Sequence, residues 1–212
     1  MSHGTSAETL SPPRAEAHPE RAEAILDLAR SAFVEKGFDG ASMQDLARAA
    51  GMSVGNFYRY FPSKAALVEA LIARDLAEVE SAFLAITTSA DPLAALKGAL
   101  AERLTRNCEE DAPLWAEIMA SAARKPDIAD LLRRMEEGVQ ARIVRVLGLV
   151  AALPEDEAAR RFGAHVRIVF MLVRGAALDR PAGQAADPDL NALILRTIDR
   201  LLDDVLAGAE EG

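Results

Sequence analysis

Apolar residues recur at helical spacing along most of the chain, and capping residues mark where the predicted helices begin. No segment alternates between apolar and polar positions with the β-branched residues and turn dipeptides of a hairpin. The pattern therefore predicts an all-α protein of about nine helices. The predicted helices cover residues 19–36, 42–49, 54–61, 64–87, 92–108, 112–123, 127–150, 155–178 and 188–207.

Residues 42–64 hold two short predicted helices joined by a glycine turn. Ser42 begins the first helix as part of an acid-bearing capping box. Gly51 supplies the positive φ that a tight turn between helices needs. Ser53 can cap the second helix, whose inward face includes Phe57. This arrangement is typical of a helix-turn-helix.

The second short helix carries side chains suited to reading DNA. Short, amide, phenolic and cationic groups match the base edges of a major groove, and lysines and hydroxyls bind phosphates. We expect Asn56 and Tyr60 to face bases, and Tyr58 and Lys64 to hold phosphates, whereas Arg59 stays unassigned. The predicted DNA-binding residues are Ser42, Ser53, Val54, Gly55, Asn56, Tyr58, Arg59, Tyr60 and Lys64.

The stretch resembles the DNA-binding domain of the TetR family of transcriptional regulators, specifically over about residues 20–75 and only in architecture beyond. The resemblance implies a homodimeric regulator that binds an inverted-repeat operator in double-stranded DNA, more often a repressor than an activator. It also implies release by a small-molecule effector, whose identity the sequence does not give. The matching residues are Ser42, Leu46, Ala47, Ala50, Gly51, Ser53, Phe57, Tyr58, Phe61, Ser63 and Lys64.

Two other classes of function stay open. Residues 51–55 match G-x-S-x-G, the nucleophile elbow of α/β-hydrolases, but that motif needs a preceding strand and a later acid and histidine. A helix precedes Ser53, and His165 is the only histidine downstream, so we expect no enzyme. The other class is a helical dimeric interaction module that does not bind DNA.

The charge is unevenly distributed along the chain. The net charge is −9, yet residues 19–64 hold six basic and six acidic side chains, so the excess acid lies elsewhere. We therefore expect a DNA-binding domain over 19–64 and a ligand-binding and dimerisation domain over 65–212. Residues 1–18 are rich in Ser, Ala, Pro and Glu, which predicts a disordered tail; a DNA-contacting arm is the alternative, although Arg14 is its only basic residue.

Composition limits the remaining options. No apolar run approaches a membrane span and no signal peptide opens the chain. One cysteine excludes an internal disulfide, which suits a cytoplasmic location. With three histidines and one cysteine, no metal-ligand cluster and no cofactor are expected.

The last two predicted helices, 155–178 and 188–207, are apolar on more faces than one contact can bury. Two such helices from each chain can form a four-helix bundle across a two-fold axis. The residues predicted at this interface are Phe162, Val169, Val173, Ile194, Ile198 and Leu201.

A small-molecule pocket is expected among helices 92–150 and the long helix before them. Ordinary core is the alternative for each candidate. Arg160, Arg167 and Arg174 lie seven residues apart. They either form ion pairs within the bundle, with acids such as Asp199 and Asp203, or lie on a solvated edge; alternatively, Arg167 binds an anionic ligand. The pocket candidates are Phe83, Leu104, Cys108, Trp115, Met119, Met135 and Arg167.

Overall fold

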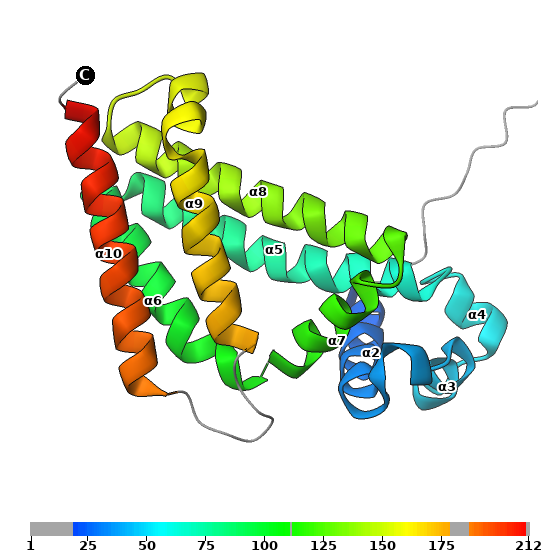
Figure 1. Ribbon diagram of the computed structural model, residues 1–212. Coiled ribbons are helices and arrows are strands. Elements are labelled where there is room, and N and C mark those ends of the chain that lie inside the picture. Colours follow the sequence, from blue (N-terminus) through cyan, green and yellow to red (C-terminus); the bar gives the residue numbers. More distant parts are fainter. Residues whose placement is uncertain (1–18, 111, 179–186, 211–212) are drawn as a thin grey trace, which may run out of the picture. The chain divides into compact units, whose positions relative to one another are not determined.

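The structure is a computed structural model that describes residues 19–110, 112–178 and 187–210 (Figure 1). The predicted tail, residues 1–18, lies outside the described residues. The described part of the chain holds nine helices and no strand, which confirms the all-α prediction. The helices are α2 (Pro19–Gly40), α3 (Met43–Ala49), α4 (Val54–Tyr58), α5 (Lys64–Thr88), α6 (Pro92–Glu110), α7 (Ala112–Ala122), α8 (Pro126–Val150), α9 (Glu155–Leu178) and α10 (Pro188–Glu210).

Side-chain caps begin five of these helices where the sequence predicts a start. In each case the side-chain oxygen accepts a hydrogen bond from the backbone N–H three residues later, at 2.9–3.3 Å. These bonds satisfy N–H groups that have no partner inside the helix. The capping residues are Ser42, Ser53, Ser63, Asp91 and Asp187.

The second helix of the helix-turn-helix is shorter than predicted. It ends at Tyr58 instead of continuing to residue 61. The N–H groups of Arg59 and Tyr60 bond to carbonyls three residues earlier, at 3.2 and 2.9 Å. Such bonds tighten the last turn, so the side chains after Tyr58 point in directions that a regular helix would not give them.

The chain divides into two compact units, one ending at Leu71 and one beginning at Ile72. The boundary lies inside α5, which therefore contributes its first turns to the first unit and the rest to the second. The functional division into a DNA-binding part over 19–64 and an effector part over 65–212 remains a prediction.

The first unit packs α2, α3, α4 and the start of α5 around a small apolar core. Gly37 has a φ of 74°, a left-handed conformation that suits glycine, and it interrupts α2. Phe38 folds back beyond this break, with its ring centroid 5.3 Å from that of Phe33. The largest fully buried side chains of this core are Ile25, Phe33, Leu46, Phe57, Leu67 and Leu71.

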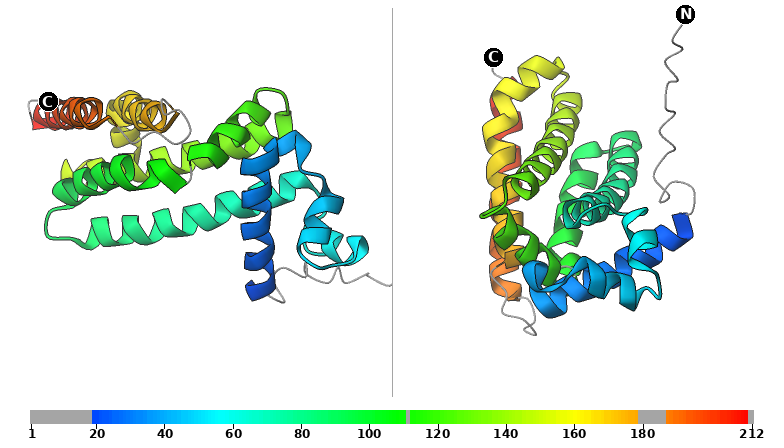
Figure 2. Two further views of the ribbon diagram at one scale, coloured as in Figure 1. Left: turned by 90° about the horizontal axis from the view of Figure 1, so that it is seen from below. Right: turned by 90° about the vertical axis from the view of Figure 1, so that its right-hand side faces the viewer.

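The second unit is a helical bundle with α9 and α10 side by side on one face (Figures 1 and 2). Helices α8 and α9 approach closely at Gly148, where an added Cβ would lie 2.9 Å from the Cβ of Ala158. Buried Asn191 of α10 donates its side-chain amide to the carbonyl of Leu104 in α6 at 3.4 Å. Within the described ranges, no helix has the length and hydropathy to cross a bilayer.

Candidate nucleic-acid interface and ligand cavity

A glycine turn and an arginine fix the geometry of the helix-turn-helix. Gly51 has a φ of 63°, as the turn after α3 requires. The N–H of Met52 bonds to the carbonyl of Ala47 at 2.9 Å and closes the turn. Arg21 of α2 donates to the carbonyl of Ala50 at 2.7 Å, which satisfies the carboxyl end of α3 and holds it against α2.

Helix α4 presents a mixed apolar and polar surface to solvent. Val54, Gly55, Tyr58 and Arg59 are exposed, and Asn56 is half-buried. No heavy atom lies within 4 Å of a Cβ built on Gly55, so nothing within this unit blocks close approach there. These residues form a surface on which an extended partner such as DNA can lie.

The outward orientation expected for Tyr60 is wrong. Its side chain is only 7% exposed and belongs to the core of the first unit. The reason is its spacing of three residues from buried Phe57, which places residue 60 on the same face as Phe57, and the bond from the Tyr60 N–H to the Phe57 carbonyl keeps it there. We therefore leave Tyr60 out of the surface that faces solvent.

Ser42 and Ser53 act as helix caps. The Ser42 hydroxyl accepts the N–H of Asp45 at 3.1 Å and donates to the carboxylate of the same residue. This hydroxyl bond, with the nearby charge of Arg48, holds the pKa of Asp45 below its usual value. Because folding lowers the pKa of Asp45, its ionised carboxylate stabilises the folded state at pH values above the pKa of the unfolded chain. This stabilisation is lost as the pH falls through the lower pKa of the folded state.

Lys64 is held within the first unit. Its Nζ donates to the carbonyls of Phe38 and Asp39 at 2.7 and 3.1 Å and lies 5.2 Å from the centroid of the Phe38 ring. These contacts fasten the start of α5 to the end of α2. The phosphate contact expected of Lys64 stays a prediction, and the observed contacts give the residue a second, structural role.

Lys64→Ala is expected to lower the midpoint of thermal unfolding of the first unit by roughly 5–10 °C, because charge-assisted hydrogen bonds to two carbonyls are lost. Lys36→Ala removes an exposed lysine of α2 and serves as the control, with little expected change. Circular dichroism melts measure both. Equal midpoints for the two variants would contradict the structural role.

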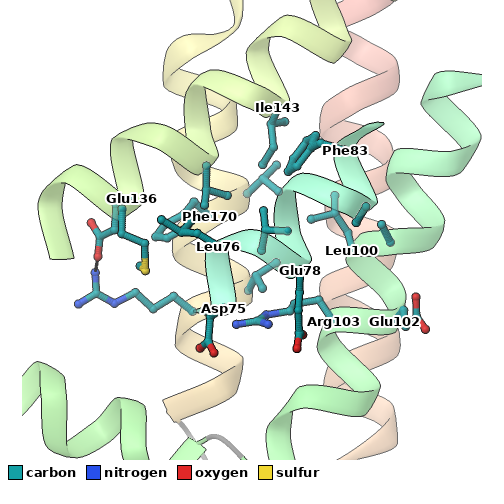
Figure 3. Close-up of a pocket in the computed structure, with 18 of the residues that line it drawn as sticks. Asp75, Leu76, Glu78, Phe83, Leu100, Glu102, Arg103, Glu136, Ile143 and Phe170 are labelled. Atoms are coloured by element: carbon teal, nitrogen blue, oxygen red, sulfur yellow. Dashed lines mark hydrogen bonds and ion pairs between the residues drawn. The ribbon is translucent and has the colours of Figure 1, made fainter. Parts of the chain in front are cut away.

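A cavity of about 410 Å³ lies inside the second unit (Figure 3). It is bounded by side chains of α5, α6, α7, α8 and α9, and its volume is in the range of roughly 300–1,000 Å³ found for small-molecule pockets. Phe83 and Ile143 lie at its apolar end, whereas Asp75, Glu78 and Arg103 lie at the opposite end. The walls between are mostly aliphatic and aromatic.

The cavity contains four of the seven predicted pocket residues, namely Phe83, Trp115, Met119 and Met135. Two others are elsewhere. Leu104 is buried in the core of the bundle, and Arg167 is exposed on α9, so neither lines this cavity. The side chain of Cys108 lies outside the described part of the structure.

The sequence analysis missed the contribution of α9. Val169, Phe170, Val173 and Arg174 line the cavity, whereas the prediction placed the pocket among the earlier helices. A signal was present in the sequence, because α9 is apolar on all sides. Such a helix is buried against several neighbours, so it can also line a cavity between them.

Arg174 connects three helices at the cavity wall. Its guanidinium forms an ion pair with Glu136 of α8, and its Nε donates to the sulfur of Met119 in α7 at 3.0 Å. Arg160 pairs with Glu157, while Asp199 and Asp203 pair with Lys97. Ion pairing between helices of the bundle is therefore seen for Arg174, with Glu136 and not with either aspartate, whereas Arg160 pairs with Glu157 of its own helix at an exposed position.

Two buried polar atoms of α7 have no hydrogen-bond partner among the described residues, Trp115 Nε1 and Ser121 Oγ. Such atoms cost stability when they stay unpaired. No three His, Cys, Asp or Glu side chains in the described ranges are placed to hold a metal ion. His165 lies with Nδ1 3.1 Å from the carbonyl of Arg161.

The residues predicted at the dimer interface lie mostly inside the chain's own core. Phe162, Val169, Ile194 and Ile198 are buried within the single chain, and Val173 lines the cavity, so these side chains are not exposed to a second chain in this structure. Leu201 is half-buried against the same core. Sequence periodicity identified these two helices as unusually apolar but could not tell which face each turns inward.

The outward faces of α9 and α10 carry other apolar side chains. Ile168 and Met171 are exposed on α9, and Leu193 is exposed on α10. The two helices lie side by side (Figure 2), and these three residues are exposed large apolar side chains on them. We call Ile168, Met171 and Leu193 the outer apolar face.

Comparison with known families decides the identity of the first unit. Residues 25–71, which include the whole helix-turn-helix, match the family model of bacterial regulatory proteins of the tetR family. The first unit therefore carries a TetR-family domain. Within this TetR-family domain, G-x-S-x-G spans the turn and the start of α4, and Ser53 is the cap of that helix rather than a nucleophile.

Curated relatives of this chain are transcriptional regulators. It is 32% identical to the transcriptional regulator UidR of Escherichia coli K12 over 118 residues, 56% of this chain and 59% of that protein. It is 33% identical to the repressor KstR of Mycolicibacterium smegmatis over 111 residues, 50% and 52% of the two chains. The chain thus spans between half and three-fifths of the length of these relatives.

Solved structures with the same fold cover more of the chain. Salmonella enterica GusR superposes with a TM-score of 0.70 and 24% identity, over 92% of this chain and 100% of that one. The flavonoid-responsive regulator FrrA gives a TM-score of 0.63 and 25% identity, over 90% and 97%. The fold of both units is therefore that of TetR-family proteins.

Proposed function

We propose that the protein is a homodimeric transcriptional repressor that binds an inverted-repeat operator and is released from it by a small molecule. The observation that carries the proposal is the exposed surface of α4. This helix belongs to a helix-turn-helix whose geometry is fixed by the cap at Ser53, the turn at Gly51 and the hydrogen bond from Arg21. A short helix with exposed valine, glycine, tyrosine and arginine suits the major groove. The family match supports the same function.

The outer apolar face supports the dimer. Apolar side chains grouped on one side of a soluble protein favour association. A second copy of this chain, related by a two-fold axis, would cover the face and present two α4 helices to DNA. The operator is then an inverted repeat with half-sites separated by ~34–36 Å or a multiple.

Helix α5 supports a coupling between ligand and DNA. It begins at Lys64, which is fastened to the end of α2, and later supplies Asp75, Val79 and Phe83 to the cavity. A ligand that prefers one position of this helix also favours one position of the attached helix-turn-helix. FrrA, a flavonoid-responsive regulator with the same fold, supports ligand control as well.

DNA binding measured over a range of salt concentrations tests which residues of the first unit contact bases and which contact phosphates. Asn56→Ala keeps the backbone bond to Ser53 and is expected to cost ~1–3 kcal/mol per half-site on the preferred operator, with a smaller loss on operators changed at its base pair. A uniform loss on all sequences would contradict base reading by Asn56.

Lys64→Ala is the companion variant in the same experiment. If Lys64 acts by fastening α5 to α2, the affinity falls while the salt slope stays at the parental value. If it holds a phosphate, the slope falls by about 0.9 for each lost contact. The second result would favour the original phosphate prediction over the structural role.

The alternative is a helical dimer that does not bind DNA. Such a protein would fold and dimerise but show no salt-sensitive binding to any duplex. The proposed function requires the protein to share a compartment with DNA, which makes a cytoplasmic location part of the proposal.

A further inference from the structure

We infer that the cavity of the second unit takes an uncharged or cationic ligand with an apolar body and discriminates against anions. The inference rests on the proposed function, because it assigns the ligand class of the proposed effector site. Three features carry it: the apolar wall of the cavity, the ion pair between Arg174 and Glu136, and the net negative charge at the end of the cavity opposite Phe83 and Ile143.

The wall requires an apolar body. Phe83 and Ile143 close one end of the cavity, and Leu100 and Phe170 line its sides (Figure 3). These side chains offer neither hydrogen bonds nor charge, so a polar molecule placed among them would lose its hydration without replacement. A ligand of this cavity therefore places its polar group elsewhere.

The polar group of a ligand would lie near Arg174 and Glu136, which already form an ion pair with each other. Arg174 binds the carboxylate of Glu136 and the sulfur of Met119. A ligand carboxylate at Arg174 would either displace Glu136, which leaves that carboxylate unpaired at the cavity wall, or lie beside it and be repelled by its charge. A hydroxyl or amide can instead donate to Glu136 while the pair stays intact, and an ammonium group adds a charge-assisted bond to the same carboxylate.

The charged end of the cavity repels anions in addition. Asp75, Glu78 and Glu102 contribute three carboxylates there against the single guanidinium of Arg103. With Glu136 and Arg174 included, the lining holds four carboxylates and two guanidinium groups. An excess of one sign of charge around an opening lowers the local concentration of ligands of that sign.

Titration calorimetry with three probes of one chain length tests the inference. Decylamine, decanol and decanoate share the same apolar body, and at pH 7 their heads are cationic, neutral and anionic. We expect decylamine and decanol to bind the parent dimer at least about tenfold more tightly than decanoate. Tighter binding of decanoate, or no saturable binding of any probe, would overturn the inference.

Two variants test the role assigned to Glu136. Glu136→Gln keeps the shape of the side chain but frees the Arg174 guanidinium, so binding of decanoate is expected to strengthen and binding of decylamine to weaken, by roughly tenfold in their ratio. Glu137→Gln removes the same charge one position along α8, from an exposed residue outside the cavity that pairs with Arg133. It should leave the ratio unchanged, and equal effects of both variants would overturn the role of Glu136.

The operator-binding assay is run separately on the same samples. Operator binding together with a preference for decanoate would reject the ligand class and leave the proposed function standing. The expected order of probes in a protein that binds no operator would reject the proposed function and leave the ligand class standing.

Discussion

The double variant Met171→Glu, Leu193→Glu is expected to be a folded monomer that binds the operator at least ~100-fold more weakly than the parent. The two side chains are 55% and 54% exposed in the single chain, so glutamate fits there without disturbing the core. In a two-fold dimer each new carboxylate occurs twice, so four charges would be desolvated at one interface.

The loss of affinity follows from the loss of bivalence. Two joined α4 helices bind two half-sites with an effective local concentration that a monomer lacks, and this is worth ~10²–10⁴-fold. Sedimentation velocity and operator titration measure the two effects in one preparation. Leu84→Glu is the matched control, because Leu84 is 67% exposed on α5 and lies outside the outer apolar face.

The control variant should remain a dimer with parental operator affinity. A double variant that stays dimeric would show that the chains associate through another surface. A monomeric double variant with parental affinity would mean that one helix-turn-helix is sufficient for binding.

Phe57→Ala is expected to abolish operator binding while leaving the dimer intact. The ring is 1% exposed at the centre of a unit built from three helices and the start of a fourth, and its removal costs about 3–5 kcal/mol. The free energy of unfolding of so small a unit is of the same order as this loss, so the first unit should unfold at room temperature. The second unit has its own core and should keep its fold.

Tyr58→Ala is the matched control for this prediction. Tyr58 is adjacent and aromatic, but 43% exposed, so its removal should leave the melting profile of the first unit nearly unchanged and weaken DNA binding only moderately. Circular dichroism reports the helix lost and sedimentation reports the dimer. Parental operator affinity in Phe57→Ala would contradict the placement of DNA binding in the first unit.

Local signals made most helix starts and turns predictable from the sequence. A serine or aspartate accepts the N–H three residues later whatever the distant chain does, so the caps at Ser53, Asp91 and Asp187 could be expected. Gly37 and Gly51 stand at positive φ where the predicted helices break. The family resemblance over the helix-turn-helix rested on the same local residues and is confirmed.

Side-chain directions that depend on neighbouring helices could not be predicted. Tyr60 is buried with Phe57, three residues earlier, so the apolar face of α4 is wider than the expected inward face suggested. Arg167 and Arg174 are seven residues apart and lie nearly above one another on α9, yet Arg174 binds Glu136 of α8 while Arg167 is exposed. The difference between the two arginines depends on the position of Glu136 on α8, which cannot be read from the sequence of α9.

The outer apolar face shows the same limit. An apolar helix can be recognised from its sequence, but the inward side is set by how it packs on its neighbours. Phe162 and Val169 point into the core, which leaves Ile168 and Met171 outside. The interface proposed from the structure is thus a different set of residues on the same two helices.

Selection of bound duplexes from random DNA by the parent protein tests the central claim most directly. The account predicts that an inverted repeat is enriched, with half-sites ~34–36 Å or a multiple apart, and that its binding weakens steeply with salt. Enrichment of no sequence, together with no salt-sensitive binding to any duplex, would contradict it.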